Sequence, residues 1–137
     1  YFNSNEDIKS YLNLINFQYK YNALTVLASG DQLFNLINKG IKTIDTFDIN
    51  KLTEYYVFGL RMAMIEKYNY KSYLKVLSIL LNEKTSFETL NNILYELIPY
   101  MDTKYRLFWK EILDYNYNLQ KIKKIKSILQ ECYSLAF

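Results

Sequence analysis

The sequence predicts a helix-dominated α/β protein that carries the start of a parallel sheet. Two short apolar runs, residues 23–28 and 41–47, flank a short amphipathic segment, which is the pattern of a strand–helix–strand unit. The remainder of the chain places its apolar residues at helical spacing. Half of the 137 residues are hydrophobic and 18% are aromatic, which provides the apolar material that a packed core needs.

The first elements alternate between helix and strand. Residues 4–16 are expected to form a short helix with its apolar side chains on one face. Residues 23–28 are expected to form a strand buried on both faces, because the run is continuous, apolar and partly β-branched. Residues 31–39 follow as a short helix, which Gly40 closes as a C-cap.

The second strand is expected over residues 41–47, although Asp45 interrupts its apolar pattern. Asn50 then serves as the N-cap of a long helix that runs to about Tyr68. Two parallel strands do not make a stable sheet alone, because each face must be covered and each edge paired. The sheet is therefore expected to be incomplete in this chain, and residues outside it or a second copy would complete it.

The second half of the chain reads as helices throughout. A Thr-Ser-Phe-Glu sequence at residues 85–88 predicts a capping box that opens a helix, and Pro99 ends that helix. The expected apolar stripes are Tyr73, Leu74, Leu77, Leu80 and Leu81; Phe87, Leu90, Leu94 and Leu97; Tyr105, Phe108, Trp109, Ile112 and Leu113; and Ile122, Ile125 and Ile128.

No repeat, low-complexity tract or linker marks a domain boundary. Residues 1–137 are therefore predicted to be a single domain or the N-terminal fragment of one, with a strand–helix–strand region at 1–68 and a helical region at 69–137. The chain begins with Tyr1 and not with Met, so we expect it to be trimmed or part of a longer chain.

Composition excludes several classes of function. The chain has no histidine, which removes histidine bases, Ser/His/Asp and Cys/His catalysis and most zinc sites, so no metal is expected. The single Cys132 cannot form an internal disulfide and fits a reducing compartment. A net charge of +3 is too small for a typical nucleic-acid binder. The N-terminus lacks the pattern of a secretion signal, so a cytoplasmic protein is predicted.

The candidate site lies where the two strands end. The loop Ser29-Gly30-Asp31 follows the first strand and opens a helix, where backbone N–H groups are unpaired and a residue without Cβ allows close approach. Asp48 ends the second strand 18 residues after Gly30, and a carboxylate in that place can accept hydrogen bonds from both ribose hydroxyls. Asn50 could bind the same ribose or an adenine edge. The alternative is that Gly30 serves only a turn and Asp48 only a helix cap.

These residues also carry a resemblance to a known family. The S-adenosylmethionine-dependent aminocarboxypropyl transferases of betaine-lipid synthesis, with their uncharacterised bacterial relatives, are similar to residues 24–65, which read LTVLASGDQLFNLINKGIKTIDTFDINKLTEYYVFGLRMAMI. The shared features are a strand ending in Ser-Gly, a Leu/Ile-rich helix closed by Gly, a second strand ending in Asp-x-Asn and a long helix. The similarity is clearest over residues 19–81.

The resemblance implies a Rossmann-like, methyltransferase-type fold with a large helical insertion. It further implies that S-adenosylmethionine is the cofactor, that Ser29 and Gly30 approach its methionine part and that Asp48 holds its ribose. The implied reaction transfers the aminocarboxypropyl group to a lipid hydroxyl and leaves methylthioadenosine. The chain departs from the pattern of ordinary methyltransferases, because its loop has one glycine where they have two or three. No catalytic residue can be assigned.

Two further segments are open to more than one interpretation. Residues 119–129 combine isoleucines with four lysines, so they could lie on a membrane surface, as suits an enzyme peripheral to the membrane, or could cover a core. Tyr105, Phe108 and Trp109 could line an acceptor pocket or a partner groove, or could be core. The rival to an enzyme is a non-catalytic, mostly helical interaction or scaffold module, and a homodimer that completes the sheet is compatible with either.

Overall fold

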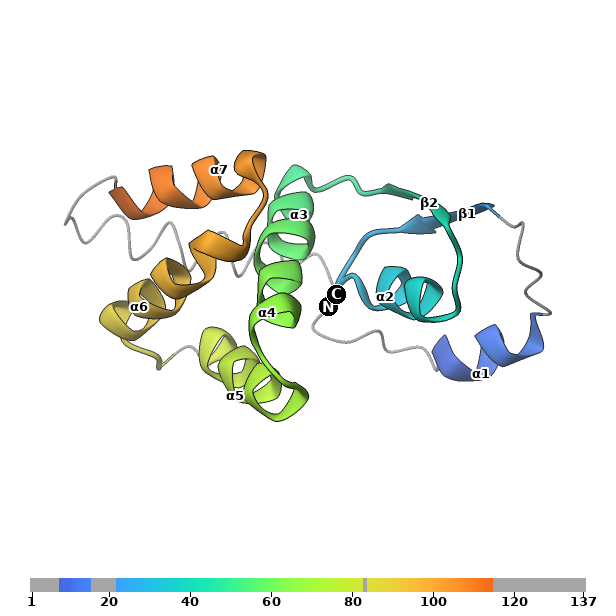
Figure 1. The fold of residues 1–137 in the computed structure, drawn as a ribbon, viewed down its shortest axis with the longest axis horizontal. Helices are drawn as coiled ribbons and strands as arrows, with labels where there is room; N and C mark the ends of the chain where they lie inside the picture. The colour runs from blue at the N-terminus through green and yellow to red at the C-terminus, as the bar shows by residue number, and fades with distance from the viewer. Residues whose placement is uncertain (1–7, 16–21, 83, 115–137) are drawn as a thin grey trace. The chain divides into compact units, whose positions relative to one another are not determined.

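The computed structural model describes residues 8–15, 22–82 and 84–114 (Figure 1). These residues belong to two compact units, which divide between Glu54 and Tyr55. The sequence predicts the boundary between the strand–helix–strand region and the helical region later, after residue 68. The fold is helix-dominated α/β with a two-stranded parallel sheet, as the sequence predicts at that level of detail.

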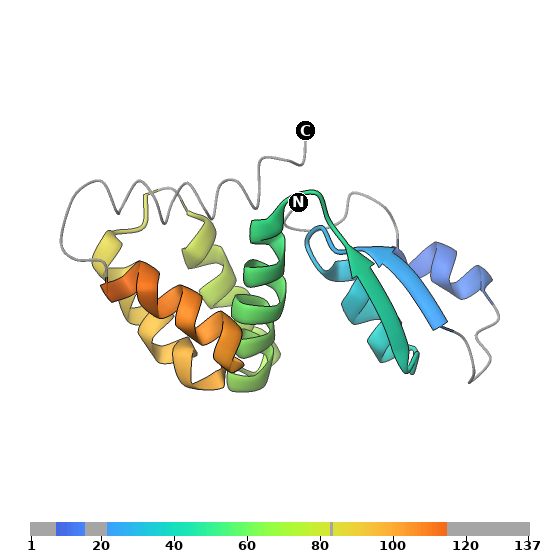
Figure 2. The same ribbon diagram turned by 90° about the horizontal axis from the view of Figure 1, so that it is seen from above.

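The first unit is a strand–helix–strand arrangement with a flanking helix. It comprises α1 (Ile8–Leu14), β1 (Asn22–Val26), α2 (Asp31–Asn38), β2 (Thr43–Phe47) and the short α3 (Lys51–Glu54). The strands pair in parallel, with Asn22 opposite Thr43 and Val26 opposite Phe47. Figure 2 shows the strands side by side, with α2 along one face of the sheet.

The core of this unit lies between α1, α2 and one face of the sheet. Leu12, Leu36 and Ile41 form its buried cluster, and Ala23 and Ile44 pack against it from the two strands. The expectation that the first strand is buried on both faces is therefore wrong for the described residues. Buried and exposed positions alternate along β1 because α2 covers only one face of the sheet.

The predicted end of α2 is confirmed in detail. Gly40 has a φ of +82°, the left-handed conformation that only glycine adopts without strain. Its N–H donates to the carbonyl of Ile37 at 2.9 Å, and the N–H of Ile41 donates to that of Leu36 at 3.2 Å. These two bonds are the paired closure typical of a helix C-terminus, and they direct the chain into β2.

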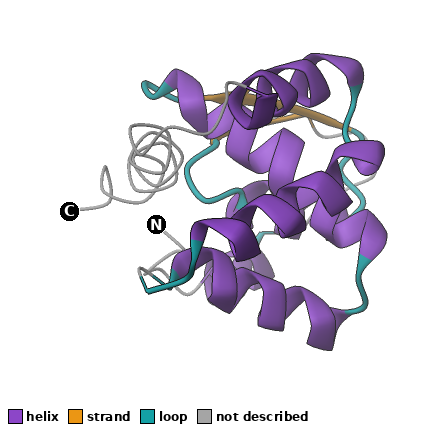
Figure 3. Cartoon of the chain, turned by 90° about the vertical axis from the view of Figure 1, so that its left-hand side faces the viewer, coloured by secondary structure: helices purple, strands orange, loops and turns teal. Residues whose placement is uncertain are grey.

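Every element described in the second unit is helical (Figure 3). The unit comprises the π-helix η1 (Tyr55–Arg61), α4 (Met62–Lys67), α5 (Tyr70–Leu81), α6 (Phe87–Leu97), the 3₁₀ turn η2 (Ile98–Tyr100) and α7 (Thr103–Asp114). Its largest fully buried side chains are Trp109, Tyr56, Leu60, Met64, Leu90, Leu94, Leu97, Met101 and Val57. The stripes expected along α5, α6 and α7 supply part of this core.

The long helix expected after Asn50 contains a π-helical segment that its sequence did not predict. Gly59, in the middle of that segment, lies against α7: a Cβ added there would be 3.0 Å from Trp109 Nε1 and 3.0 Å from Tyr105 Cβ. Trp109 Nε1 also donates a hydrogen bond to the carbonyl of Tyr55 at 3.1 Å. The absence of a side chain at Gly59 thus lets the indole pack directly on the wider helix.

Side-chain caps begin the next two helices. Asn69 Oδ1 accepts from the N–H of Ser72 at 3.0 Å and starts α5, a cap that sequence reasoning missed. Ser86 Oγ accepts from the N–H of Thr89 at 3.2 Å and starts α6. The expected start of this helix is therefore confirmed, but the predicted capping box of Thr85 with Glu88 is wrong. Ser86 is the capping residue, and the hydroxyl of Thr85 instead donates to the carbonyl of Ile79 at 2.7 Å.

Candidate functional site

The carboxyl ends of β1 and β2 are joined by the side chain of Asp48. Its Oδ2 accepts a hydrogen bond from the N–H of Ala28 at 2.9 Å, just beyond the end of β1. Its Oδ1 accepts from the N–H of Asn50 at 2.8 Å, ahead of α3. The N–H of Leu27 also donates to the carbonyl of Phe47 at 2.8 Å. This bond continues the backbone hydrogen bonding between β1 and β2 one residue past the end of β1. The two loops named from the sequence are thus brought together.

The loop after β1 is held by its own short-range hydrogen bonds. Ser29 Oγ donates to Asp31 Oδ2 at 2.9 Å and accepts from the N–H of Asp31 at 3.4 Å. Gly30 has a φ of +85° and donates its N–H to the carbonyl of Leu27 at 2.7 Å. Ser29 and Gly30 are buried, whereas Asp31 is half-buried. The hydroxyl and carboxylate in this loop therefore stabilise the entry into α2.

Asn50 caps α3, as the sequence predicts. Its Oδ1 accepts from the N–H of Leu52 at 2.9 Å, and its carbonyl accepts from the N–H of Thr53 at 3.1 Å. Both oxygens thus satisfy N–H groups of the first helical turn. A role for this side chain in binding ribose or adenine would compete with that cap.

Two features of this site were not foreseen. Ala28 has a φ of +40°, an uncommon conformation for a residue with a Cβ, and no sequence signal indicates it. Thr25 Oγ1 donates to Gln32 Oε1 at 2.5 Å, which joins the buried side of β1 to the first turn of α2. The rule that a polar side chain on the covered face of a strand needs a partner could have suggested that contact.

Asp48 keeps acceptor capacity beyond its structural bonds. A carboxylate offers about four lone-pair sites on two oxygens, and the two backbone N–H groups occupy one site on each oxygen. The residue is half-buried. It can therefore both hold the strand ends and receive further donors. The described residues contain no group of three or more acidic or cysteine side chains that could hold a metal ion.

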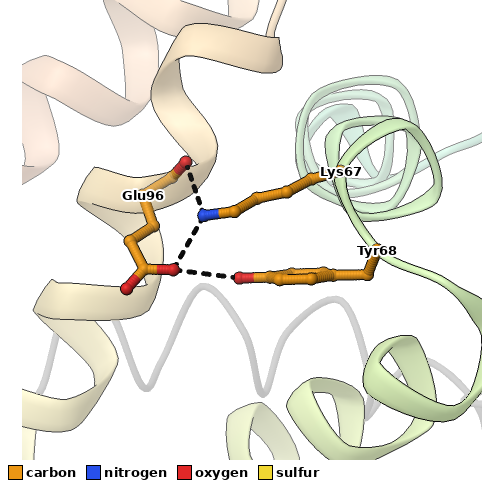
Figure 4. A network of polar contacts seen from close by, with 3 residues as sticks. All are labelled: Lys67, Tyr68 and Glu96. Atoms are coloured by element: carbon orange, nitrogen blue, oxygen red, sulfur yellow. Dashed lines mark hydrogen bonds and ion pairs between the residues drawn. The ribbon is translucent and has the colours of Figure 1, made fainter.

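A second polar cluster lies on the second unit, between α4 and α6 (Figure 4). Lys67 Nζ lies 2.7 Å from Glu96 Oε2 and also donates to the Glu96 carbonyl at 3.2 Å. Tyr68 donates its hydroxyl to the same Oε2 at 3.2 Å. The Lys67 side chain is 19% exposed and that of Glu96 is 61% exposed. This contact joins two helices at the surface.

The charges of this cluster shift its pKa values. The hydrogen bond and the charge of Lys67 lower the pKa of Glu96. Burial works to lower the pKa of Lys67, but its interactions with Glu96 and Tyr68 outweigh burial, so that pKa is raised. Burial, opposed in part by Lys67, raises the pKa of the Tyr68 hydroxyl. All three groups keep their ordinary charges near neutral pH, as a structural contact requires.

The aromatic residues of α7 pack against the π-helix. Trp109 is fully buried, and the Phe108 ring stacks on that of Tyr55 with a centroid distance of 4.0 Å. Tyr105 meets Tyr55 edge to face at 5.9 Å, and Lys104 Nζ lies over both tyrosine rings at 5.5 and 5.7 Å. Of the interpretations open for this cluster, the core role is confirmed for Trp109.

Comparison of the chain with protein-family models, with curated proteins and with solved structures gives no match. The resemblance to aminocarboxypropyl transferases accordingly stays a prediction. Among the described helices, none is both long and apolar enough to cross a bilayer. The amphipathic segment 119–129 lies outside the described residues.

Proposed function

We propose that the first unit binds S-adenosylmethionine at the carboxyl ends of β1 and β2, as part of a Rossmann-like transferase. The observation that carries the proposal is the hydrogen bond from the N–H of Ala28 to Asp48, which joins two neighbouring parallel strand ends. Ligands of open parallel sheets bind outside these ends. On this proposal the helical second unit corresponds to the insertion of such transferases.

Asp48 is the residue on which the proposed site depends. Its remaining acceptor sites receive the two ribose hydroxyls, while its backbone bonds hold the carboxylate in place. Ser29, Gly30, Asp31 and Asn50 contribute indirectly, because their hydrogen bonds shape the two loops. When bound, S-adenosylmethionine would supply a carbon activated by its sulfonium, for transfer to the hydroxyl of a lipid on the resemblance, with methylthioadenosine as the leaving group. The task of the protein is then positioning, and no described residue is assigned as a catalytic base.

Calorimetric titration with S-adenosylmethionine, and separately with methylthioadenosine, tests the proposal. Asp48→Asn removes one charged acceptor. Asp45→Asn is the matched control because Asp45 lies on β2, the strand that Asp48 follows, and is exposed. Loss of hydrogen bonds to a charged group weakens binding roughly 10- to 100-fold. We expect that loss for Asp48→Asn and unchanged affinity for Asp45→Asn. Absence of binding to the folded wild-type chain, or equal affinity in both variants, contradicts the proposal.

A second candidate is a non-catalytic interaction module. The observation that favours it is the exposure of large apolar side chains on the sheet, Leu24 at 72% and Phe47 at 55%. Patches of this kind mark protein interaction sites. The two candidates differ in the surface they use, because the cofactor proposal depends on the strand ends and the module depends on the sheet face.

A further inference from the structure

The turn that follows β1 has an unusual backbone conformation. The N–H of Gly30 donates to the carbonyl of Leu27 at 2.7 Å, so residues 27–30 form a hydrogen-bonded β-turn. Ala28, the second residue of this turn, has a φ of +40°, and no other residue with a side chain has a positive φ in the part of the chain that the structure describes. Ser29, the third residue, does not share that conformation. The turn therefore has the pattern of type II′, which normally places glycine where this chain has Ala28.

The turn directs a backbone N–H toward Asp48. In a regular strand, the N–H groups of successive residues point to opposite edges. Here the N–H of Leu27 donates to the carbonyl of Phe47 at 2.8 Å, and the N–H of Ala28 donates to Asp48 Oδ2 at 2.9 Å. Both bonds go to the same stretch of chain at the end of β2, which a continued strand could not achieve. The turn is therefore the feature that brings a donor to the carboxylate.

The contacts around Ala28 hold both the turn and the carboxylate. The peptide unit between Leu27 and Ala28 is bound at each of its polar groups, since its carbonyl accepts from Gly30 and its N–H donates to Asp48. A strained φ persists only where surrounding contacts maintain it, and such residues gather at functional sites. Asp48 Oδ1 also accepts from the N–H of Asn50 at 2.8 Å. One bond on each oxygen fixes the plane of the carboxylate, whereas the bond to Asn50 alone would not.

We propose that the strained turn at Ala28 positions the Asp48 carboxylate, which makes Ala28 a positioning residue of the site. The inference rests on the proposed function for its ligand, a nucleoside whose two ribose hydroxyls donate to the second acceptor site of each carboxylate oxygen. Ala28 acts through Asp48 and needs no contact with the ligand itself. The bond to Asp48 also compensates for the strained φ, because an N–H donates more strongly to a carboxylate than to a neutral oxygen.

Nuclear magnetic resonance of the full chain without ligand tests the contact between the turn and Asp48. An amide proton bound to a carboxylate is shifted downfield and is protected from exchange with solvent. Asp48→Asn is expected to move the Ala28 amide signal upfield and to speed its exchange roughly tenfold. Asp45→Asn is the control, since Asp45 is exposed on β2, and should change neither value. An Ala28 amide that Asp48→Asn leaves unchanged overturns the inference, whether or not the chain binds a ligand.

Two substitutions of Ala28 test its effect on ligand affinity. Ala28→Gly keeps the N–H and adopts a positive φ without strain, so its affinity for S-adenosylmethionine and for methylthioadenosine should equal that of the wild-type chain. Ala28→Val introduces a β-branched side chain, which a positive φ does not accommodate. The turn should then change, and both affinities should fall roughly tenfold. Calorimetric titration measures the affinities, and circular dichroism shows whether each variant is folded.

The double variant separates positioning from a general effect on the fold. In the Asp48→Asn background, Ala28→Val should cause no further loss of affinity, because the carboxylate that Ala28 positions is already absent. Equal losses in both backgrounds, or wild-type affinity in Ala28→Val, overturn the inference. A wild-type chain that binds neither nucleoside contradicts the proposed function instead. The amide measurement needs neither a ligand nor a substitution at Ala28, so it decides the role of the turn in that case and in the case that Ala28→Val does not fold.

Discussion

At the residue scale, single side chains in this protein combine local and long-range roles. Asp48 accepts two backbone N–H groups from different loops, and Trp109 both fills the core of the second unit and donates to the carbonyl of Tyr55. Gly59 acts by lacking a side chain, because the indole of Trp109 occupies the space that a Cβ would need. Substitutions at such positions change more than one interaction at once.

Gly59→Ala is expected to destabilise the second unit. The added Cβ would lie 3.0 Å from Tyr105 Cβ, which is fixed to the backbone of α7 and cannot rotate away. Overpacking of this kind costs about 1–3 kcal/mol, and the better helix propensity of alanine offsets up to about 1 kcal/mol of it. Urea unfolding followed by fluorescence of Trp109, the one tryptophan in the sequence, measures the change. A urea midpoint of unfolding equal to that of the wild-type chain would contradict the prediction, because it would show that α7 moves to make room for the added Cβ.

At the element scale, short polar contacts determine where helices begin and how they are joined. Asn50, Asn69 and Ser86 each accept a backbone N–H at the start of a helix. Lys67 and Glu96 link α4 to α6 at the surface. Caps of this type contribute about 1 kcal/mol each, whereas an exposed ion pair contributes less.

The Lys67–Glu96 contact is expected to weaken in acid. Because the folded-state pKa of Glu96 is lowered, its contribution to stability is present above the ordinary glutamate pKa and is lost as pH falls through the lowered value. Glu96 is 61% exposed, so Glu96→Gln should cost only about 0.3–0.5 kcal/mol at pH near 7 and nothing at pH near 2. Urea unfolding at both pH values measures this cost. Glu111→Gln on α7 is the control, and an equal loss there would remove any special role for Glu96.

At the scale of the whole molecule, the described chain consists of two compact units with different architectures. The first is a two-stranded parallel sheet covered on one face, and the second is helical. A helical unit can bury the apolar side of each helix within itself. A two-stranded sheet with one crossover helix cannot, so Leu24, Val26 and Phe47 stay exposed on the face that α2 leaves uncovered.

The sequence by itself determined the elements whose causes are local. Three predictions match the structure because each acts within a few residues. They are the amphipathic spacing of residues 31–39, the glycine at position 40 and the capping side chain of Asn50. The parallel pairing of the two strands also followed, because a strand, a short helix and a second strand have few ways to connect.

The tertiary structure alone decided the features that depend on partners distant in sequence. Which face of β1 is covered depends on the packing of α1 and α2, and the π-helix at Tyr55–Arg61 packs against the indole of Trp109, about fifty residues later. The bond from Ala28 to Asp48 likewise requires both strand ends to be placed first. Local propensity carries no information about such contacts, because their energy exists only after the chain has folded.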